Sequence, residues 1–445
     1  MGKSGLLGLG AVCSLGLGLL VACGGGDTGT GLPGIGGAAG SGTGGTGVGG
    51  GSGGSAGVAG SATGGAGGAG GAAGSGAVGG GGTGGAPACN SGPNDDQDKD
   101  GFTVADGDCN DCDAKVNPGA IEVATPSGET AKDDDCNGTV DDVPATCDDA
   151  VALDEKDPVT VAKSIELCKA ATGAKDWGLV SAKWVLPDGT AVATANETNY
   201  HLGHGALPAF GTNGKVQNGK RLLGLSSGTA RQPSDPGYQA PSGFSKGYTS
   251  GSPTGFPKES PACPNVTTGA PNDGVALEVE VRVPTNAVAF SFDSNFYTYE
   301  WPTYVCSQYN DFFLALMSPV PSGLTDANVV YDSAGNLISV NSALLDVCSC
   351  TGGPPCTAGS KSYSCAQGGS LLLGTGFGKD TANGEDHGAT GWLVTTVPVT
   401  GGSTVTMRFT VYDSGDGVYD STTLLDNWTW LTSGAPTTPT TKAKP

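Results

Sequence analysis

Histidine and basic residues are scarce in this sequence of 445 residues. It contains three His, and 21 Lys and Arg stand against 43 Asp and Glu, which gives a formal net charge of -22. Three histidines argue against a metalloenzyme whose metal is held by several imidazoles. The surplus of negative charge argues against nucleic acid or an anionic membrane surface as a binding partner. Cations are the ligands that such a charge favours.

Aromatic and charged residues are also few, at 6% and 14%, whereas Gly is abundant, with 81 copies. A single enzyme-like core over the whole length is not expected, because part of this chain cannot bury enough apolar surface. Gly shows no strict triplet period, which excludes a collagen repeat. The 14 Cys indicate an oxidising compartment.

An apolar stretch near the start, Leu6 to Val21, is too short and too rich in Gly to span a bilayer stably. It follows the single positive charge of Lys3. This arrangement is typical of a secretory signal peptide, which we predict over residues 1–22.

The stretch ends in Leu20-Val21-Ala22-Cys23, which resembles a bacterial lipobox. The resemblance implies that Cys23 becomes the acylated N-terminus and attaches the protein to membrane lipid. Gly24 stands where an Asp would retain many lipoproteins in the inner membrane, so we expect a lipid-anchored, surface-exposed protein of the outer membrane. The alternative is an ordinary signal peptide followed by an incidental Cys.

Residues 23–88 are predicted to be a disordered stalk. Between residues 24 and 87, 34 of 64 residues are Gly, and most of the others are Ala, Ser, Thr and Val. Such a segment cannot offset its backbone entropy by burying apolar surface. Treated as a flexible coil, it spans roughly 45 Å, which would lift a folded part away from the lipid.

Residues 89–146 form an acidic module. Between residues 90 and 160 there are 20 acidic residues and four Lys. Two short segments have the spacing of a calcium loop, with oxygen donors at positions one, three and five, a Gly at six and a backbone carbonyl at seven. The predicted donors of the first segment are Asp96, Asp98, Asp100, Phe102 and Asp108, and those of the second are Asp133, Asp135, Asn137, Thr139 and Asp142.

The stretch from Asp96 to Asp142 resembles the MopE-type metal-binding motif, which is related in style to thrombospondin type 3 calcium repeats. It departs from that motif at Val123 and Ala124, where a Cys is usual, and Cys112 is a candidate substitute as disulfide partner. Position twelve of the first loop is Gly107, so this is not a regular EF-hand.

Calcium is the metal that these oxygen donors favour, and we expect the module to fold only with calcium bound. Copper is an unlikely ligand, because the stretch contains no His or Met and its Cys are expected in disulfides. A solvated acidic linker is the remaining alternative.

The cysteines support a body of two folded parts. Without Cys13 and Cys23, twelve Cys remain, six in residues 89–168 and six in residues 263–365. Six Cys allow 15 pairings, so we predict only one pair, Cys147 with Cys168, and no free thiols. That pair flanks the one clear helix signal, in which Asp157 is the N-cap and Pro158 the first residue.

Residues 147–432 have a sequence pattern typical of β-structure. Short alternating or β-branched runs are separated by Gly and Pro turns, which predicts a mainly β fold, a two-sheet jelly-roll-like sandwich. The runs are Gly178–Val185, Val275–Val283, Ala287–Phe292, Phe312–Met317, Trp392–Val399 and Thr404–Tyr412. The Thr- and Pro-rich end, 433–445, is predicted to be a disordered tail.

Three parts of this region stand out: the run Leu222–Ala230, the block Ala289–Phe313 and the acidic hairpin Asp413–Asn427. Together they resemble the choice-of-anchor L domain of bacterial surface proteins. The sequence departs from the family in having one acid, Glu300, where two often stand together. The resemblance implies a surface protein whose anchor here is the lipobox.

Acids of the same region are candidates for a second metal site. The predicted ligands are Glu300, Asp311, Asp416, Asp420 and Asp426, with Asn310 and Asp413 as further oxygen donors if the strand order follows the family. The alternative is that these side chains make Asx turns and loop hydrogen bonds.

Two other patterns are weaker. Gly224-Leu225-Ser226-Ser227-Gly228 fits the nucleophile elbow of hydrolases, but the residues that follow are loop-like and only His387 comes later. His201 and His204 are expected to be surface or hydrogen-bonded residues rather than metal ligands.

The sequence therefore predicts a non-enzymatic surface lipoprotein, in which a calcium-stabilised module and a β-sandwich serve adhesion or the binding of an extracellular protein or glycan. Sequestration of calcium or copper is the alternative function, and a hydrolase using Ser226 is a further, less favoured one.

Overall fold

A computed structural model describes residues 89–142, 145–378 and 387–444. The predicted signal peptide, Cys23 and the predicted Gly-rich stalk lie outside the described residues. Among the helices that are described, none has the length and apolar character needed to cross a membrane.

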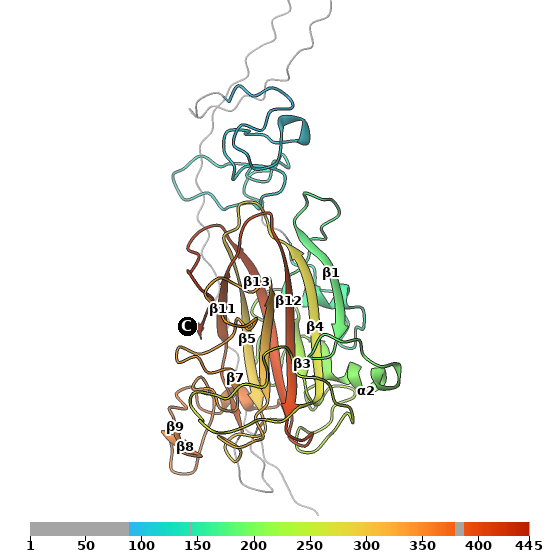
Figure 1. Cartoon of the computed structure of the whole chain (residues 1–445), viewed down its shortest axis with the longest axis vertical. Helices are drawn as coiled ribbons and strands as arrows, with labels where there is room; N and C mark the ends of the chain where they lie inside the picture. Colours follow the sequence, from blue (N-terminus) through green and yellow to red (C-terminus); the bar gives the residue numbers. More distant parts are fainter. Residues whose placement is uncertain (1–88, 143–144, 379–386, 445) are drawn as a thin grey trace, which may run out of the picture. The chain divides into compact units, whose positions relative to one another are not determined.

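The first sheet contains five antiparallel strands in the order β1, β4, β12, β6, β7 (Figure 1). The strands are β1 Gly178–Val185, β4 Pro271–Arg282, β12 Thr404–Ser414, β6 Phe312–Ser318 and β7 Ile338–Ser339. Side chains alternate on β4, where Leu277 and Val279 enter the core while Glu278 faces the other way and pairs with Arg408 and Lys183. This period of two is what a strand with one buried face requires.

The second sheet has seven strands. Its main order is β14, β11, β5, β13, β3, β2, and β10 pairs with β5. The strands are β2 His204–Leu207, β3 Leu222–Ser226, β5 Ala289–Thr298, β10 Gly388–Ala389, β11 Leu393–Pro398, β13 Ser421–Leu431 and β14 Thr440–Ala443. A separate hairpin joins β8 Cys356–Ala358 to β9 Lys361–Tyr363.

The two sheets pack face to face over one apolar core. Phe292 of β5 and Phe409 of β12 are fully or almost fully buried, and their ring centroids lie 5.1 Å apart at an interplanar angle of 78°. Trp428 of β13 stacks on Phe290 at 4.1 Å. Contacts between aromatic rings of opposite sheets stabilise such a sandwich through large buried areas. The mainly β, two-sheet fold expected from the sequence is thus confirmed.

The helices are short. Helix α1 covers Pro158–Val161 and continues as a 3-10 turn over Ala162–Ile165. The carboxylate of Asp157 accepts a hydrogen bond from the backbone N–H of Thr160, so the predicted N-cap is confirmed. A second helix, α2, covers Glu197–Tyr200. Further 3-10 turns cover Val104–Asp106, Thr194–Asn196, His201–Gly203 and Ser370–Leu372.

All twelve described cysteines form disulfides. The predicted pair Cys147–Cys168 has an S–S distance of 2.02 Å. The other pairs are Cys89–Cys112, Cys109–Cys136, Cys263–Cys306, Cys348–Cys365 and Cys350–Cys356. No pair joins the set in residues 89–168 to the set in residues 263–365, so both sets close on themselves, as their even numbers predict.

The acidic module is built of loops. Residues 89–142 contain one 3-10 turn, Val104–Asp106, and no strand. With few apolar side chains to bury, its described part is held by the disulfides Cys89–Cys112 and Cys109–Cys136 and by hydrogen bonds from backbone N–H groups to carboxylates. Cys112 does take the role of a disulfide partner, with Cys89.

The prediction of a disordered tail over 433–445 is wrong for its end. Thr440–Ala443 form β14, which pairs antiparallel with β11 from Leu393 to Thr396. The Thr- and Pro-rich composition suggested disorder, but Thr is also a β-branched residue that suits an edge strand. The sandwich therefore extends past the expected boundary at residue 432.

Candidate metal centres

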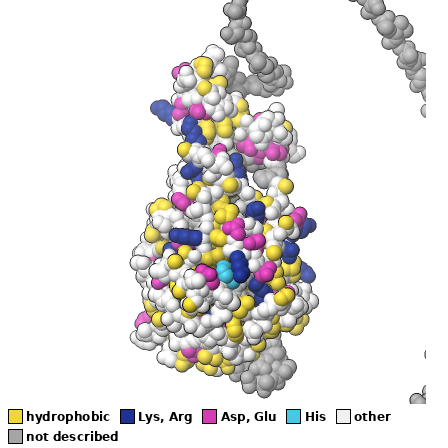
Figure 2. All heavy atoms as spheres, turned by 90° about the vertical axis from the view of Figure 1, so that its right-hand side faces the viewer, with side chains coloured by type: hydrophobic (Ala, Val, Ile, Leu, Met, Phe, Trp, Pro, Cys, Tyr) yellow, Lys and Arg dark blue, Asp and Glu magenta, His cyan; other side chains and the backbone are white. Residues whose placement is uncertain are grey.

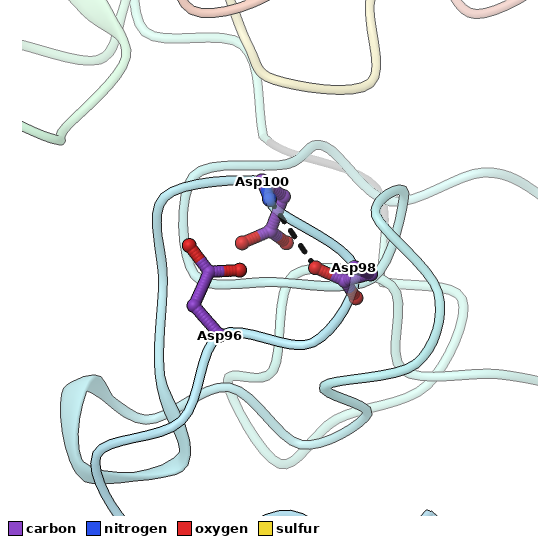
Figure 3. A group of neighbouring side chains, drawn as sticks. All are labelled: Asp96, Asp98 and Asp100. Carbon is purple, nitrogen blue, oxygen red and sulfur yellow. Dashed lines mark hydrogen bonds between the residues drawn. The ribbon is translucent and has the colours of Figure 1, made fainter.

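Three carboxylates of the first predicted loop converge. Asp96, Asp98 and Asp100 each offer an oxygen within 4.8 Å of the others, and Figure 3 shows their side chains turned towards a common centre. The turn needs a left-handed backbone at Gly101, whose φ is 96°. This is the geometry that the spacing of the loop predicts.

Backbone N–H groups fix the orientation of these carboxylates. The N–H of Asp100 donates to Asp98 Oδ1 at 3.2 Å, and that of Phe102 donates to Asp100 Oδ1 at 2.7 Å. The N–H of Gly101 donates to Asp96 Oδ2 at 3.2 Å. One oxygen of each carboxylate is thus held by the backbone while the other is left for a further interaction. The side chain of Phe102 is buried.

A second group adjoins the first and shares Asp98. Oxygens of Asp98, Asp108 and Asp111 lie within 4.8 Å of one another, and Asp108 and Asp111 are buried. The sequence predicted Asp108 but not Asp111, because Asp111 lies outside the loop spacing and is brought in by the bend of the chain. Asp111 Oδ1 accepts a hydrogen bond from the N–H of Gln97 at 3.0 Å, which joins the two segments.

The electrostatics of these groups disfavour their charged forms in the absence of a cation. Burial, followed by the charges of Asp100, Asp98 and Asp111, raises the pKa of Asp108 to about 6. Burial also raises the pKa values of Asp98 and Asp100. A bound divalent cation reverses this effect, because it favours the ionised carboxylates.

The second predicted loop has a different ligand arrangement from the expected one. Oxygens of Glu122, Asp135 and Asp142 lie within 4.8 Å of one another, and Asp133 is not in this group. Asp133 instead accepts hydrogen bonds from the N–H groups of Asn137 and Gly138, at 3.0 and 2.8 Å. Asp133 was predicted as a ligand together with Asp135, and the structure instead brings Asp135 together with Glu122 and Asp142.

The remaining predicted residues of this loop also make hydrogen bonds. The side-chain oxygen of Asn137 accepts from the N–H of Thr139 at 2.8 Å, and its Nδ2 donates to Asp142 at 3.2 Å. Glu122 accepts from the N–H groups of Asp134 and Asp141, at 2.8 and 2.9 Å. Glu122 was not among the predicted ligands, because it precedes the second loop and lies outside its spacing.

In the sandwich, two of the five predicted ligands meet. Glu300, from the segment between β5 and β6, and Asp311, which directly precedes β6, come within 4.8 Å of Asp413 of β12. Asp413, which the sequence identified only as a further donor, completes this group. Asp416 lies in the hairpin between β12 and β13, half-buried, and its negative charge raises the pKa of all three carboxyls.

Asp420 and Asp426 do not join this group. Asp420 is buried, and the charge of Lys246 opposes the rise in its pKa that burial causes. Asp426 lies within β13 and accepts hydrogen bonds from the N–H groups of Gln217 and Asn427, at 2.6 and 2.7 Å. Asp420 and Asp426 are thus predicted ligands that the structure does not bring into the group of Glu300, Asp311 and Asp413, although the charge of Asp311 acts on Asp420.

Acidic side chains are thus gathered in groups rather than spread evenly. On the face shown in Figure 2 some of them adjoin Lys and Arg side chains. The groups of the module and of the sandwich contain no basic side chain, and none of the five ion pairs among the described residues involves a member of these groups.

The Ser226 motif does not have the geometry of a nucleophile elbow. Ser226 ends β3 and is buried, and its hydroxyl donates to the carbonyl of Ser421 at 3.2 Å and accepts from Thr422 Oγ1 at 2.8 Å. The described residues directly after it form bends rather than a helix, whereas an elbow requires a helix there.

The two neighbouring histidines bind each other. His201 Nδ1 lies 2.6 Å from His204 Nε2, and His204 is fully buried against Trp184 with ring centroids 3.8 Å apart. Burial lowers the pKa of both imidazoles. The hydrogen-bonded role expected for this pair is confirmed, although His204 lies in the interior and not on the surface.

Comparison with known proteins adds no family to this description, since no family model, curated protein or solved structure matches the chain.

Proposed function

We propose that this chain is a non-enzymatic lipoprotein of the outer-membrane surface. In this proposal Cys23 carries the lipid, the Gly-rich segment is the stalk, and the acidic module binds calcium. The β-sandwich is then held away from the membrane, where it binds an extracellular protein or glycan in adhesion.

One observation supports the calcium part of the proposal above all others. Asp98, Asp100, Asp108 and Asp111 each have a buried Oδ2 without a hydrogen-bond partner. Buried carboxylate oxygens without a partner carry a high free-energy cost. A cation coordinated by these oxygens removes that cost, and four oxygens from one short segment suit the large coordination number of calcium.

The donor chemistry favours calcium over copper. The described part of the module offers carboxylates and backbone carbonyls, and its four Cys are consumed in two disulfides. Hard oxygen donors suit calcium, whereas copper prefers imidazole, thiolate or thioether ligands. Sequestration of metal remains the second candidate function, because the described residues include several clusters of carboxylates, each of which could hold an ion.

The calcium proposal is tested by calorimetric titration of the metal-free full-length protein. Asp98→Asn together with Asp100→Asn should weaken binding by about tenfold or more, because each change removes a charged ligand. Asp95→Asn is the matched control, since Asp95 lies in the same segment but outside the carboxylate groups. No heat with calcium in the wild type, or equal affinity in the double variant, would contradict the proposal.

The same titration distinguishes the two candidate functions. A stabilising role predicts a few tightly held calcium ions per chain that copper does not displace. A sequestering role predicts a larger number of exchangeable ions or a preference for copper.

A further inference from the structure

The sandwich contains a group of buried acids that the acidic module does not explain. Glu300, Asp311 and Asp413 are 1%, 0% and 0% exposed, and each offers an oxygen within 4.8 Å of the other two. They come from three different places in the fold: the segment after β5, the residue before β6, and β12. Three carboxylates that meet while buried need a physical explanation, because their charges repel.

Hydrogen bonds do not supply that explanation. Both oxygens of Asp413 and the Oδ2 of Asp311 are buried without a hydrogen-bond partner. The backbone N–H of Ser414 donates to Asp311 Oδ1 at 3.2 Å, and that of Asp311 lies 3.4 Å from Glu300 Oε2. A fully buried carboxylate with neither oxygen satisfied is rare in folded proteins and indicates a partner that is not part of the chain.

Ion pairs do not explain why these three acids meet either. None of the five ion pairs among the described residues includes these three acids. Burial raises the pKa of Asp311 to about 7, and burial together with neighbouring negative charge also raises the pKa values of Glu300 and Asp413 above their ordinary values. The acids are therefore either protonated or neutralised by a cation. A proton shared between the carboxyls of Asp413 and Asp311 is the alternative to a bound cation, and the experiment below distinguishes the two.

We propose that Glu300, Asp311 and Asp413 bind a calcium ion inside the β-sandwich. Three carboxylates and no nitrogen or sulfur donor match the preference of calcium for oxygen. Asp416 is the fourth candidate ligand, because it is half-buried in the adjoining hairpin and its charge influences all three acids. This site is separate from those of the module and does not depend on them.

The position of the site gives the ion a structural task. It ties the segment between β5 and β6 to β12 and to the hairpin that follows. Half-buried tyrosines belong to the same two segments: Tyr304 lies 5.4 Å from Tyr309 and 5.6 Å from Tyr419, measured between ring centroids. The backbone N–H of Tyr304 donates to the carbonyl of Glu300 at 2.9 Å, so the cluster is attached directly to a ligand residue.

These tyrosines make the site measurable. Terbium replaces calcium in oxygen sites and emits strongly when nearby Tyr or Trp rings transfer excitation to it. The module, residues 89–142, contains no Tyr or Trp, whereas Tyr304, Tyr309 and Tyr419 adjoin the proposed site. The terbium emission of the full-length protein, excited through its aromatic rings, should therefore report the site in the sandwich through these tyrosines. Trp177, Trp428 and Trp430 line the same pocket as Glu122, Asp135 and Asp142, so the variant Glu122→Gln is needed to identify any emission from that group.

The experiment compares that emission in the wild type and in variants. Asp413→Asn should reduce it by about tenfold or more and should lower the number of bound calcium ions by one. Glu300→Gln should act in the same way, which covers the case that one variant folds poorly. Glu280→Gln, on β4 outside the group, is the matched control and should leave the emission unchanged. Glu122→Gln and the module variant Asp98→Asn with Asp100→Asn should also retain it.

The outcomes separate this proposal from the one for the module. Emission that is lost in Asp413→Asn but kept in the module variants supports the buried site, whatever the module binds. Emission in Asp413→Asn and Glu300→Gln equal to the wild type overturns it. Loss only in Glu122→Gln also overturns it, because the signal would then come from the group of Glu122, Asp135 and Asp142.

Discussion

At the residue scale, the fold keeps the buried side chain of His204 uncharged. Its ring stacks on Trp184, its Nε2 bonds His201, and its pKa is lowered by burial and then by the positive charges of His201, Arg231, Lys246 and Lys156. The folded protein therefore holds this imidazole neutral. In the unfolded chain the same imidazole takes up a proton below about pH 6.5.

This asymmetry predicts a loss of stability in acid. Because the folded pKa lies below the unfolded one, the unfolded state binds more protons as the pH falls through about 6.5, and the free energy of unfolding decreases by up to about 1.4 kcal/mol per pH unit. His204→Phe keeps the ring stacking but cannot take up a proton. Between pH 7.5 and pH 5, at saturating calcium, the free energy of unfolding of the wild type should therefore decrease relative to that of His204→Phe.

Denaturant unfolding at several pH values provides the measurement. Comparison with the variant cancels the contributions of the many carboxyls, which the two proteins share. Parallel curves for the wild type and His204→Phe would show that His204 does not contribute to the pH dependence.

The carboxylates show which ligand positions can be predicted from the sequence. Asp96, Asp98 and Asp100 could be predicted to converge because they lie within one tight loop, where spacing determines direction. Asp111 lies only three residues after Asp108 but outside the spacing of the loop. Glu122 and Asp413 reach their groups through chain segments that are distant in sequence, so spacing contains no signal for their meeting. Asp426 was misplaced for the same reason, since its neighbours depend on the pairing of β13.

At the scale of elements, the C-terminal strand β14 depends on one charged residue. Lys444 forms an ion pair with Asp293, which is 1% exposed, and its Nζ also donates to Gln217 at 2.9 Å. A buried carboxylate that loses its cationic partner is costly. Lys444 thus attaches the end of β14 to the second sheet.

Lys444→Met should therefore lower the free energy of unfolding by about 3 kcal/mol, because it leaves the charge of Asp293 buried and unpaired. Lys442→Met is the matched control two residues earlier in the chain. Lys442 is exposed, and its replacement should change stability by less than about 0.5 kcal/mol. Urea unfolding of the two variants measures the difference, and equal stabilities would show that the ion pair does not hold the strand.

Strands with alternating residues could be predicted, whereas short ones could not. The 11-residue strand β13 was also missed, because its first six residues are all buried and show no alternation. The predicted run Gly178–Val185 coincides with β1, and the runs at 312–317, 392–399 and 404–412 overlap β6, β11 and β12. Strands β7, β8, β9 and β10 have two or three residues each, too few for a period to appear. They form because a neighbouring strand pairs with them or because a disulfide such as Cys350–Cys356 fixes their position.

At the scale of the whole molecule, negative charge is the feature that needs compensation. The chain has a net charge of -22. The described residues contain four clusters of three acidic side chains, and the oxygens within each cluster are close enough to share an ion. Disulfides restrain the unfolded chain but do not neutralise these charges. Divalent cations would do so, and the proposed calcium sites therefore link the acidity of the sequence to the stability of the fold.

The most direct test of this account is thermal unfolding of the full-length protein in calcium and in chelator at matched ionic strength. A ligand that binds only the folded state stabilises it by about 2.7 kcal/mol at a hundred times its dissociation constant. We predict that saturating calcium raises the unfolding temperature by about 5 °C or more, and that Asp98→Asn with Asp100→Asn reduces the rise. Superimposable unfolding curves in calcium and chelator would contradict the account.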